Sequence, residues 1–205
     1  MRTAITGGIG SGKSYVCRML REWGISVYDC DAHAKRLMVE DEGLRRQLTE
    51  LIGPDTYIRR EDGGAEMTTA APCSSATATR FALNKAVVAR FLMSSAENAH
   101  ALEHIVHPAV IGDFLNSGME WVESAILFES GLHRYVDRVV VVVAPEEVRI
   151  ARVMERDGIS REKALEWINR QLPQQQLEGR ADHIIVNDGQ TPLRPQIEKL
   201  TTLCA

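Results

Sequence analysis

The sequence lacks the features that would mark it as a membrane or disulfide-bonded protein. Its longest apolar run, VVVVVA at 139–144, is far shorter than the roughly 20 residues that a membrane helix needs. Its cysteines are scattered and include no C-x-x-C pair, which favours reduced thiols in a cytoplasmic protein over a disulfide framework. Met1 and Arg2 lead directly into an expected strand, so we expect no signal peptide.

An excess of positive charge is also missing. The net charge of −4 provides no general field for nucleic acid, so any anionic ligand must be bound by a local arrangement of residues. The apolar fraction of 44% and the charged fraction of 25% are ordinary for a globular protein, and 205 residues suit one domain of moderate size with one insertion. We therefore expect no nucleic-acid partner and no membrane partner.

Short β-type runs alternate with helical patterns along the chain. The strands are expected at 2–6, 25–29, 121–129, 138–144 and 183–188. Such alternation predicts a parallel sheet covered on both faces, with ligands bound beyond the carboxyl ends of the strands. Those ends carry GGIGSGKS, DCD and FES, which converge on one edge of the predicted sheet.

Helical patterns occupy most of the remaining chain. The first helix begins at Lys13, because apolar residues recur at helical spacing, and it ends near Gly24. Residues 43–118 are mostly helical in pattern, with a loop expected at 61–79. A helix at 145–158 should end at Gly158, a second at 160–172 should be capped by Ser160, and a helix closes the chain.

The stretch GGIGSGKS at 7–14 fits the P-loop pattern G-x-x-x-x-G-K-[ST] between a strand and a helix. Its glycines let backbone N–H groups turn inward as an anion nest, and the following helix adds a partial positive charge at its start. Lys13 is expected to reach the β- and γ-phosphates of a nucleoside triphosphate, and the Ser14 hydroxyl to bind Mg²⁺. The alternative is a glycine-rich turn with a chance Gly-Lys-Ser.

Asp29 and Asp31 follow the second expected strand. Because side chains alternate along a strand, one aspartate is expected to face the sheet interior and the other the phosphate crevice. A carboxylate in that crevice can orient an acceptor hydroxyl and take its proton during phosphoryl transfer. Both aspartates could instead cap the next helix.

Two further clusters allow a functional and a plain interpretation. Arg149, Arg152 and Arg156 share one helix face, which could neutralise a transferred phosphoryl group or pair with neighbouring glutamates. His100, His104 and His107 also share a face, but Pro108 follows at once and no cysteine or convincing carboxylate completes a metal site. We favour surface or substrate contacts for the histidines.

Together these residues resemble the dephospho-coenzyme A kinases, the P-loop enzymes that complete coenzyme A synthesis. The matching segments, in order, are TGGIGSGKS (6–14), DCD (29–31), HP (107–108), LFE (127–129), RVMERDG (152–158) and ADHIIVNDG (181–189). The resemblance spans nearly the whole chain. It implies a three-layer α/β/α fold with a central five-stranded parallel sheet, a helical substrate insertion at 32–118 and a helical lid at about 146–175, within a core of 1–31 and 119–205.

The resemblance also implies roles for individual residues. Asp31 would be the base, with Lys13 and Arg152 as the other catalytic residues. The residues that would bind ATP are Gly8, Gly10, Ser11, Gly12, Lys13, Ser14, Tyr15, Asn187 and Gly189. Those that would bind the acceptor are Asp31, Lys85, His107 and Glu129. The implied reaction transfers the γ-phosphate of ATP, with Mg²⁺, to the ribose 3′-hydroxyl of dephospho-coenzyme A, in a monomer or weak homo-oligomer.

Two positions depart from the family pattern. Tyr15 stands where the family usually has threonine, which removes a small hydroxyl beside the phosphates. Residues 66–80 do not match the usual sequence before the LNK at 83–85. The rival interpretations are a kinase for another small molecule, such as a nucleoside monophosphate, and a nucleotide-dependent switch. A switch should carry a guanine-selecting Asn-Lys-x-Asp, and NKAV at 84–87 lacks the aspartate.

Overall fold

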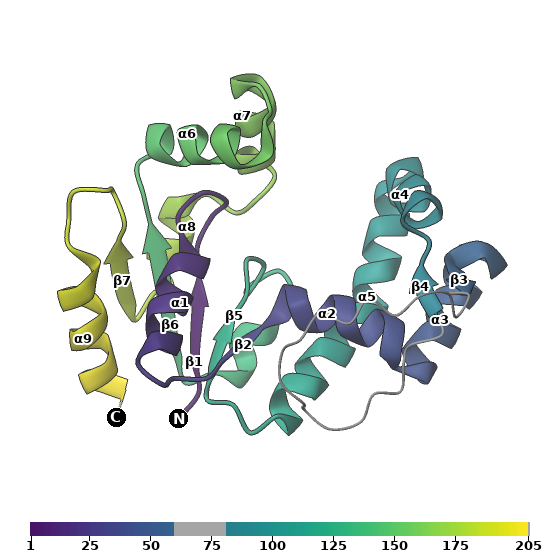
Figure 1. Cartoon of the computed structure of the whole chain (residues 1–205), viewed down its shortest axis with the longest axis horizontal. Coiled ribbons are helices and arrows are strands. Elements are labelled where there is room, and N and C mark those ends of the chain that lie inside the picture. Colours follow the sequence, from purple (N-terminus) through teal and green to yellow (C-terminus); the bar gives the residue numbers. More distant parts are fainter. Residues whose placement is uncertain (60–80, 205) are drawn as a thin grey trace, which may run out of the picture. The chain divides into compact units, whose positions relative to one another are not determined.

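The computed structural model describes residues 1–59 and 81–204. The chain divides into two compact units, one made of Met1–Asp31 with Asp113–Ala205 and the other of Ala32–Gly112. The first unit contains a parallel sheet, and the second is mainly helical (Figure 1). The segment 61–79, expected as a loop, lies outside the described residues.

The sheet of the first unit has five parallel strands in the order β2-β5-β1-β6-β7. Their bounds are β1 Thr3–Thr6, β2 Val27–Asp29, β5 Trp121–Glu123, β6 Arg138–Val143 and β7 His183–Val186. β1 lies between two strands that are distant in sequence, because Ala4 is opposite Val122 on one side and Val139 on the other. The predicted parallel sheet is confirmed.

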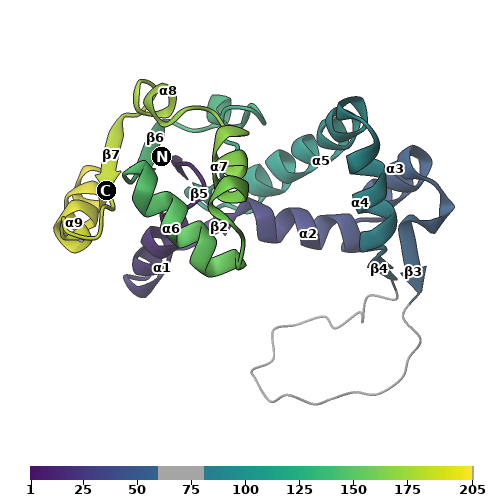
Figure 2. The same ribbon diagram turned by 90° about the horizontal axis from the view of Figure 1, so that it is seen from above.

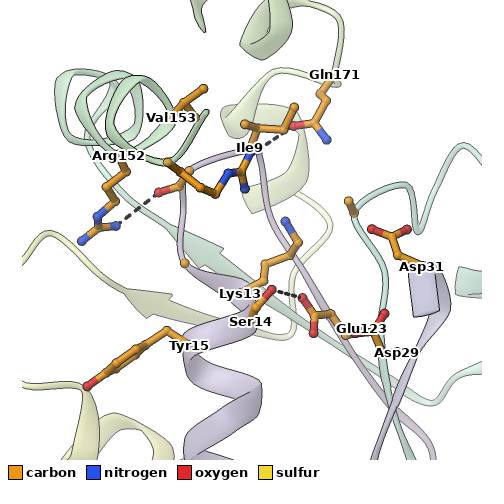
Figure 3. Close-up of a pocket in the computed structure, with 14 residues that line it drawn as sticks. Ile9, Lys13, Ser14, Tyr15, Asp29, Asp31, Glu123, Arg152, Val153 and Gln171 are labelled. Carbon is orange, nitrogen blue, oxygen red and sulfur yellow. Dashed lines mark hydrogen bonds between the residues drawn. The ribbon is translucent and has the colours of Figure 1, made fainter. Parts of the chain in front are cut away.

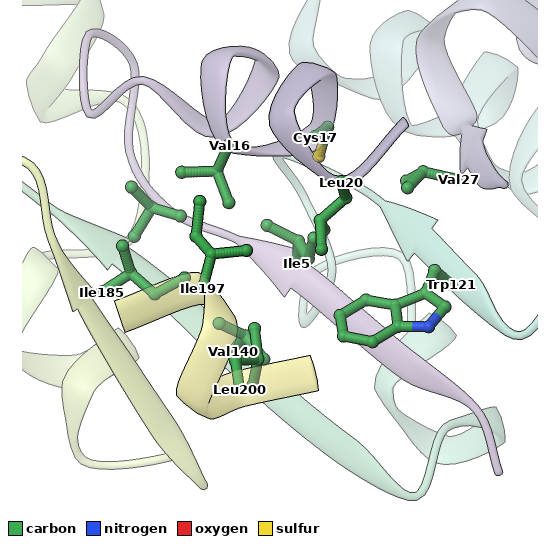
Figure 4. Packing of buried hydrophobic residues seen from close by; sticks show 11 residues of the cluster. Ile5, Val16, Cys17, Leu20, Val27, Trp121, Val140, Ile185, Ile197 and Leu200 are labelled. Atoms are coloured by element: carbon green, nitrogen blue, oxygen red, sulfur yellow. The ribbon is translucent and has the colours of Figure 1, made fainter. Parts of the chain in front are cut away.

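Two helices cover one face of this sheet. They are α1 (Lys13–Glu22) and α9 (Leu193–Cys204), at opposite ends of the chain. Val16 and Leu20 of α1 meet Ile197 of α9 over Ile5 and Val140, and Figure 4 shows these side chains interleaved above the strands. Every fourth or third residue of α1 therefore lies in the core, as the apolar spacing predicted.

Other segments cover the opposite face. Tyr28, which alternates with Val27 along β2, is fully buried, and its ring lies 5.3 Å from the ring of Phe114. The Tyr28 hydroxyl donates a hydrogen bond to Asp113 at 2.7 Å. Two short helices also belong to this unit, η2 at Leu132–Tyr135 and α8 at Gln174–Glu178, and α8 contacts β6. The sheet is thus a middle layer between helices.

The helices α6 (Glu146–Asp157) and α7 (Arg161–Asn169) lie side by side after β6 (Figures 1 and 2). Gly158 ends α6 with a φ of 63°, and the Ser160 hydroxyl caps α7 by accepting a hydrogen bond from the Lys163 N–H at 3.3 Å. Both boundaries were predicted. The two helices share an apolar cluster of Ile150, Val153, Ala164 and Ile168.

The strand expected at 121–129 is much shorter, and this part of the prediction is wrong. β5 ends at Glu123, and residues 125–130 form turns. The cause is local, because the Ser124 hydroxyl accepts a hydrogen bond from the Ile126 N–H at 3.3 Å and turns the chain. The carboxyl end of this strand therefore carries Glu123, not the FES segment.

The second unit contains more than helices. It includes most of α2 (Cys30–Glu40) and of α5 (Ala96–Asn116), together with α3 (Glu42–Ile52), η1 (Pro54–Thr56) and α4 (Lys85–Ser94). A small antiparallel pair, β3 (Tyr57–Arg59) with β4 (Phe81–Leu83), was not predicted. Across residues 1–59 and 81–204, no helix is both long enough and apolar enough to pass through a membrane.

Candidate active site

The P-loop connects β1 to α1 at the carboxyl edge of the sheet and borders a cavity of about 460 Å³. The cavity lies wholly within the first unit. Its polar and charged lining comes from Lys13, Ser14, Tyr15, Asp29, Asp31, Glu123, Arg152, Arg156 and Gln171. Gly10 and Gly12 also line it.

Lys13 extends from the start of α1 into the cavity (Figure 3). Its amine donates a hydrogen bond to the Gly7 carbonyl at 2.7 Å. Burial lowers the pKa of Lys13, while the nearby carboxylates of Glu123 and Asp31 act in the opposite direction. The carboxylates favour the charged form of the amine. Lys13 is therefore placed to meet the negative charge of a nucleotide phosphate.

Ser14 and Glu123 form a pair that the sequence did not reveal. The Ser14 hydroxyl donates a hydrogen bond to Glu123 Oε1 at 2.8 Å across 109 residues of sequence, and Glu123 Oε2 is buried without a hydrogen-bond partner among the described residues. The serine oxygen, with its proton turned toward Glu123, keeps lone pairs for a cation. Mg²⁺ takes one or two protein oxygens together with phosphates, so this pair fits a magnesium ion.

The two aspartates of DCD do not alternate as predicted. Asp29 is the last residue of β2, and the chain turns into α2 at Cys30, so Asp31 already belongs to a helix. Both aspartates line the cavity, and neither is confined to the sheet interior. The expectation that one of them faces the interior is therefore wrong. Residues two apart on an extended strand lie on the same face, and β2 has in any case ended at Asp29.

The arginines of α6 make unequal contacts. The buried Arg149 donates through Nε to the Ile9 carbonyl at 2.9 Å, and burial lowers its pKa. Arg152 donates through Nη1 to the carbonyls of Gly10 and Ser11 at 3.3 and 3.4 Å. Arg156 pairs with Asp157 at 2.7 Å and also lines the cavity. The face is thus mainly a support for the P-loop and not an exposed row of ion pairs.

Close packing explains two glycines of the P-loop. A Cβ at Gly8 would lie 2.3 Å from Arg149 Nη2, and one at Gly10 would lie 2.6 Å from the Arg149 carbonyl oxygen. Gly10 also has a φ of 78°, which favours glycine. The loop is therefore shaped for α6 as well as for phosphate.

Asn187, which the family resemblance implies to bind ATP, lies behind the loop. It is buried, its Nδ2 donates to the Ser11 carbonyl at 2.8 Å, and its Oδ1 accepts from Arg152 at 3.3 Å. Gly189 is exposed and has a φ of 85° in the turn after β7. Among the described residues, neither of these two borders the cavity, and neither do Gly8 and Ser11.

The residues expected at the acceptor are spread over both units. Lys85 begins α4 and His107 lies on α5, both in the second unit, whereas Glu129 is exposed in the first unit and does not border the cavity. His104 Nδ1 lies 2.8 Å from the His100 carbonyl oxygen. In the described part of the chain, no group of three His, Cys, Asp or Glu side chains is arranged to hold a metal ion.

Sequence reasoning missed Glu123 and Gln171. A predicted strand that stopped before Ser124 would have placed Glu123 at its carboxyl end, where ligands bind. Gln171 gave no local signal, because its contact with the P-loop joins residues 162 positions apart.

The family model for dephospho-CoA kinase matches residues 1–66 and 76–192. The chain belongs to the dephospho-CoA kinase family. A curated relative, the dephospho-CoA kinase of Chlorobaculum tepidum, is 36% identical over 206 residues, covering 96% of this chain and 91% of that protein. The family resemblance drawn from the motifs is confirmed.

Solved structures agree. TT1252 from Thermus thermophilus is 30% identical, with a TM-score of 0.73 over 100% of this chain and 95% of that chain. The dephospho-CoA kinase from Campylobacter jejuni is 18% identical, and its TM-score of 0.65 over 99% of this chain and 96% of that chain supports the fold alone. The fold of the dephospho-CoA kinase family is thus the fold of this chain.

Proposed function

We propose that this chain transfers the γ-phosphate of ATP to the ribose 3′-hydroxyl of dephospho-coenzyme A, giving coenzyme A and ADP. The observation that carries the proposal is one cavity in which the P-loop lysine faces two aspartates and a glutamate. A kinase needs this combination, because a phosphate donor and a proton acceptor for the hydroxyl must meet at one place. Membership of the dephospho-CoA kinase family supports the choice of acceptor.

The chain's own residues divide the work. The P-loop from Gly8 to Tyr15 holds the triphosphate, and Lys13 neutralises charge on the phosphates. Asp31 orients the acceptor hydroxyl and takes its proton. Arg152, which lines the cavity beside the loop, stabilises the transferred phosphoryl group. Most of the rate enhancement comes from positioning and charge neutralisation.

Magnesium belongs to this proposal. Ser14 and Glu123 are the residues that would hold it, since the serine oxygen and the unpartnered Glu123 oxygen lie together at the cavity. When bound with ATP, Mg²⁺ neutralises charge on the β- and γ-phosphates. We also assign Asn187 and Gly189 to ATP binding. Asn187 contributes through its hydrogen bond to the Ser11 carbonyl of the P-loop.

We assign acceptor binding to the second unit, with Lys85 and His107 as contacts, and Glu129 as a contact from the first unit. The assignment rests on the family resemblance of these positions. The helices α6 and α7 act as the lid. A cytoplasmic location suits the buried free thiols of Cys17 and Cys30, and we propose a monomer or weak homo-oligomer.

One measurement separates this proposal from a nucleoside monophosphate kinase and from a slow switch. The protein is mixed with MgATP and candidate acceptors, and ADP release is followed. We expect strong stimulation by dephospho-coenzyme A and none by nucleoside monophosphates. Stimulation by the monophosphates alone contradicts the proposal, and slow release independent of any acceptor points to a switch.

A further inference from the structure

Ile9, at the tip of the P-loop, is bound on three sides by the segment that contains α6 and α7. Its N–H donates a hydrogen bond to Gln171 Oε1 at 2.6 Å, and its carbonyl accepts one from Arg149 Nε at 2.9 Å. Its side chain packs against the cluster of Ile150, Val153, Ala164 and Ile168. Both polar groups of the residue and its side chain are therefore engaged by this one segment.

The backbone on either side of Ile9 leaves little freedom for another arrangement. Gly8 is buried against the Arg149 guanidinium, and Gly10 touches the Arg149 backbone closely enough to exclude a Cβ. Arg149 thus fixes the loop from the α6 side. Gln171, which follows α7, is the group that fixes it from the other side, and Figure 3 shows this bond at the rim of the cavity.

A phosphate-binding loop works through the direction of its backbone N–H groups, so a peptide that can rotate weakens the whole nest. Without an acceptor at Gln171, the Ile9 N–H would have to find water or turn toward another group. We propose that Gln171 is a positioning residue, which holds the P-loop in its phosphate-binding form and links α7 to the bound nucleotide. The inference rests on the proposed function only in taking the loop as the triphosphate site.

The test compares Gln171→Leu with Gln175→Leu. Gln175 is an exposed glutamine of α8, four positions further along the chain, and its side chain does not reach the P-loop cavity. MgATP affinity is measured by calorimetry without any acceptor. We expect about three- to tenfold weaker binding for Gln171→Leu, the effect of one lost hydrogen bond, and wild-type binding for Gln175→Leu.

A second measurement separates positioning from a merely structural role. Amide hydrogen exchange is followed for the peptides that cover 7–12 and α7, with and without MgATP. In wild type and Gln175→Leu, MgATP should slow exchange in both peptides. In Gln171→Leu, exchange at 7–12 should be about tenfold faster without ligand, and saturating MgATP should no longer slow exchange in α7.

The proposal is overturned if Gln171→Leu matches Gln175→Leu in MgATP affinity and in exchange at 7–12. It is also overturned if α7 responds to MgATP equally in both variants. Should Gln171→Leu fail to fold by circular dichroism, Gln171→Asn takes its place, because it keeps the amide but withdraws the acceptor by one methylene. Failure to phosphorylate dephospho-coenzyme A would refute the proposed function and leave these binding measurements unaffected.

Discussion

Asp29 and Asp31 present two carboxylates to one cavity. Their roles differ in whether the carboxylate accepts a proton from the acceptor or contributes only its charge. A general base touches the acceptor hydroxyl and is needed mainly in the transition state. A carboxylate that contributes only its negative charge affects the free energy of bound ATP and that of the transition state to the same extent. Exchanging each carboxylate for an amide of the same shape distinguishes these two contributions.

Asp31→Asn should lower kcat by about 10²- to 10⁴-fold, the usual contribution of a general base. MgATP affinity should change by less than about tenfold, because the carboxylate is not needed to hold the phosphates. Single-turnover kinetics and a MgATP titration measure the two quantities separately. Asp29→Asn is the matched control, since it removes the same charge from the same cavity. Equal losses of kcat in both variants would mean that charge, not proton acceptance, is the cause, and a loss in Asp29→Asn alone would reverse the assignment.

The thiol of Cys30, between these two aspartates in the sequence, is buried, and so is the thiol of Cys17. Burial raises the pKa of Cys30 to about 12, and it raises the pKa of Cys17 as well. A thiol in the unfolded chain ionises near pH 9, so between about pH 9 and 12 the unfolded chain binds fewer protons than the folded one. Stability due to these thiols is present below pH 9 and is lost as the pH rises.

We therefore expect the free energy of unfolding to fall above pH 9 by up to about 1.4 kcal/mol per pH unit for each thiol. Urea titrations at several values between pH 8 and 11 measure this slope. Cys30→Ala should give a shallower slope, because one titrating group is removed. An unchanged slope in that variant would show that Cys30 does not contribute.

At the scale of elements, the P-loop and α6 are fitted to each other through glycine. Gly10 has a φ of 78° and faces the Arg149 backbone, whereas Gly24, after α1, has a φ of 81° and would have open space around a Cβ. The two glycines have nearly the same positive φ and differ in their surroundings. Their alanine variants therefore separate backbone strain from the contact between the loop and the helix.

Gly24→Ala should lose about 1–2 kcal/mol of unfolding free energy, the cost of a left-handed residue, and bind MgATP normally. Gly10→Ala should lose more, because its Cβ would lie 2.6 Å from the Arg149 carbonyl oxygen, and it should bind MgATP poorly. Urea unfolding and calorimetry provide the comparison. Equal stability and equal MgATP binding in the two variants would contradict the fit between loop and helix.

Some helices and strands could be predicted from the sequence, and others could not. The P-loop, α1 and β6 were predictable because their signals are local: a motif, a helical apolar period and a run of valines. β5 was predicted too long, because Ser124 ends it through a single side-chain hydrogen bond. The strands β3 and β4 were missed because each has only three residues within the region 43–118, whose sequence pattern is mostly helical.

The candidate site divides in the same way. Lys13, Ser14, Asp29 and Asp31 were found because they lie within short motifs next to expected strands. Glu123 and Gln171 were not found, because each acts on the P-loop from more than a hundred residues away in sequence. Glu123 reaches the loop because β5 lies next to β1 in the sheet, and Gln171 reaches it because the chain returns to the loop after α7.

At the scale of the whole molecule, the nucleotide cavity and the expected acceptor contacts on α4 and α5 belong to different units. Each ligand should therefore leave its own pattern of protection. MgATP should slow amide exchange in the P-loop and raise the stability of the first unit, by about 2.7 kcal/mol at a hundred times its Kd. Dephospho-coenzyme A should slow exchange within the second unit, including α4 and α5.

Hydrogen exchange measured with each ligand alone tests this division. A non-phosphorylatable ATP analogue added with dephospho-coenzyme A gives the combined pattern. Protection by dephospho-coenzyme A confined to the first unit would contradict the assignment of acceptor binding to the second.

The position of β1 in the middle of the sheet has a consequence for how the protein is made. β1 is synthesised first, but its neighbours β5 and β6 begin at Trp121 and Arg138. At about 5–20 residues per second, the ribosome needs roughly 6–24 s to reach the first of them. Until β6 has also emerged, the P-loop follows a strand that has nothing to pair with on that side. A nascent chain that stops short of Val143 should therefore be unable to hold ATP, although the continuous segment of the second unit is already complete.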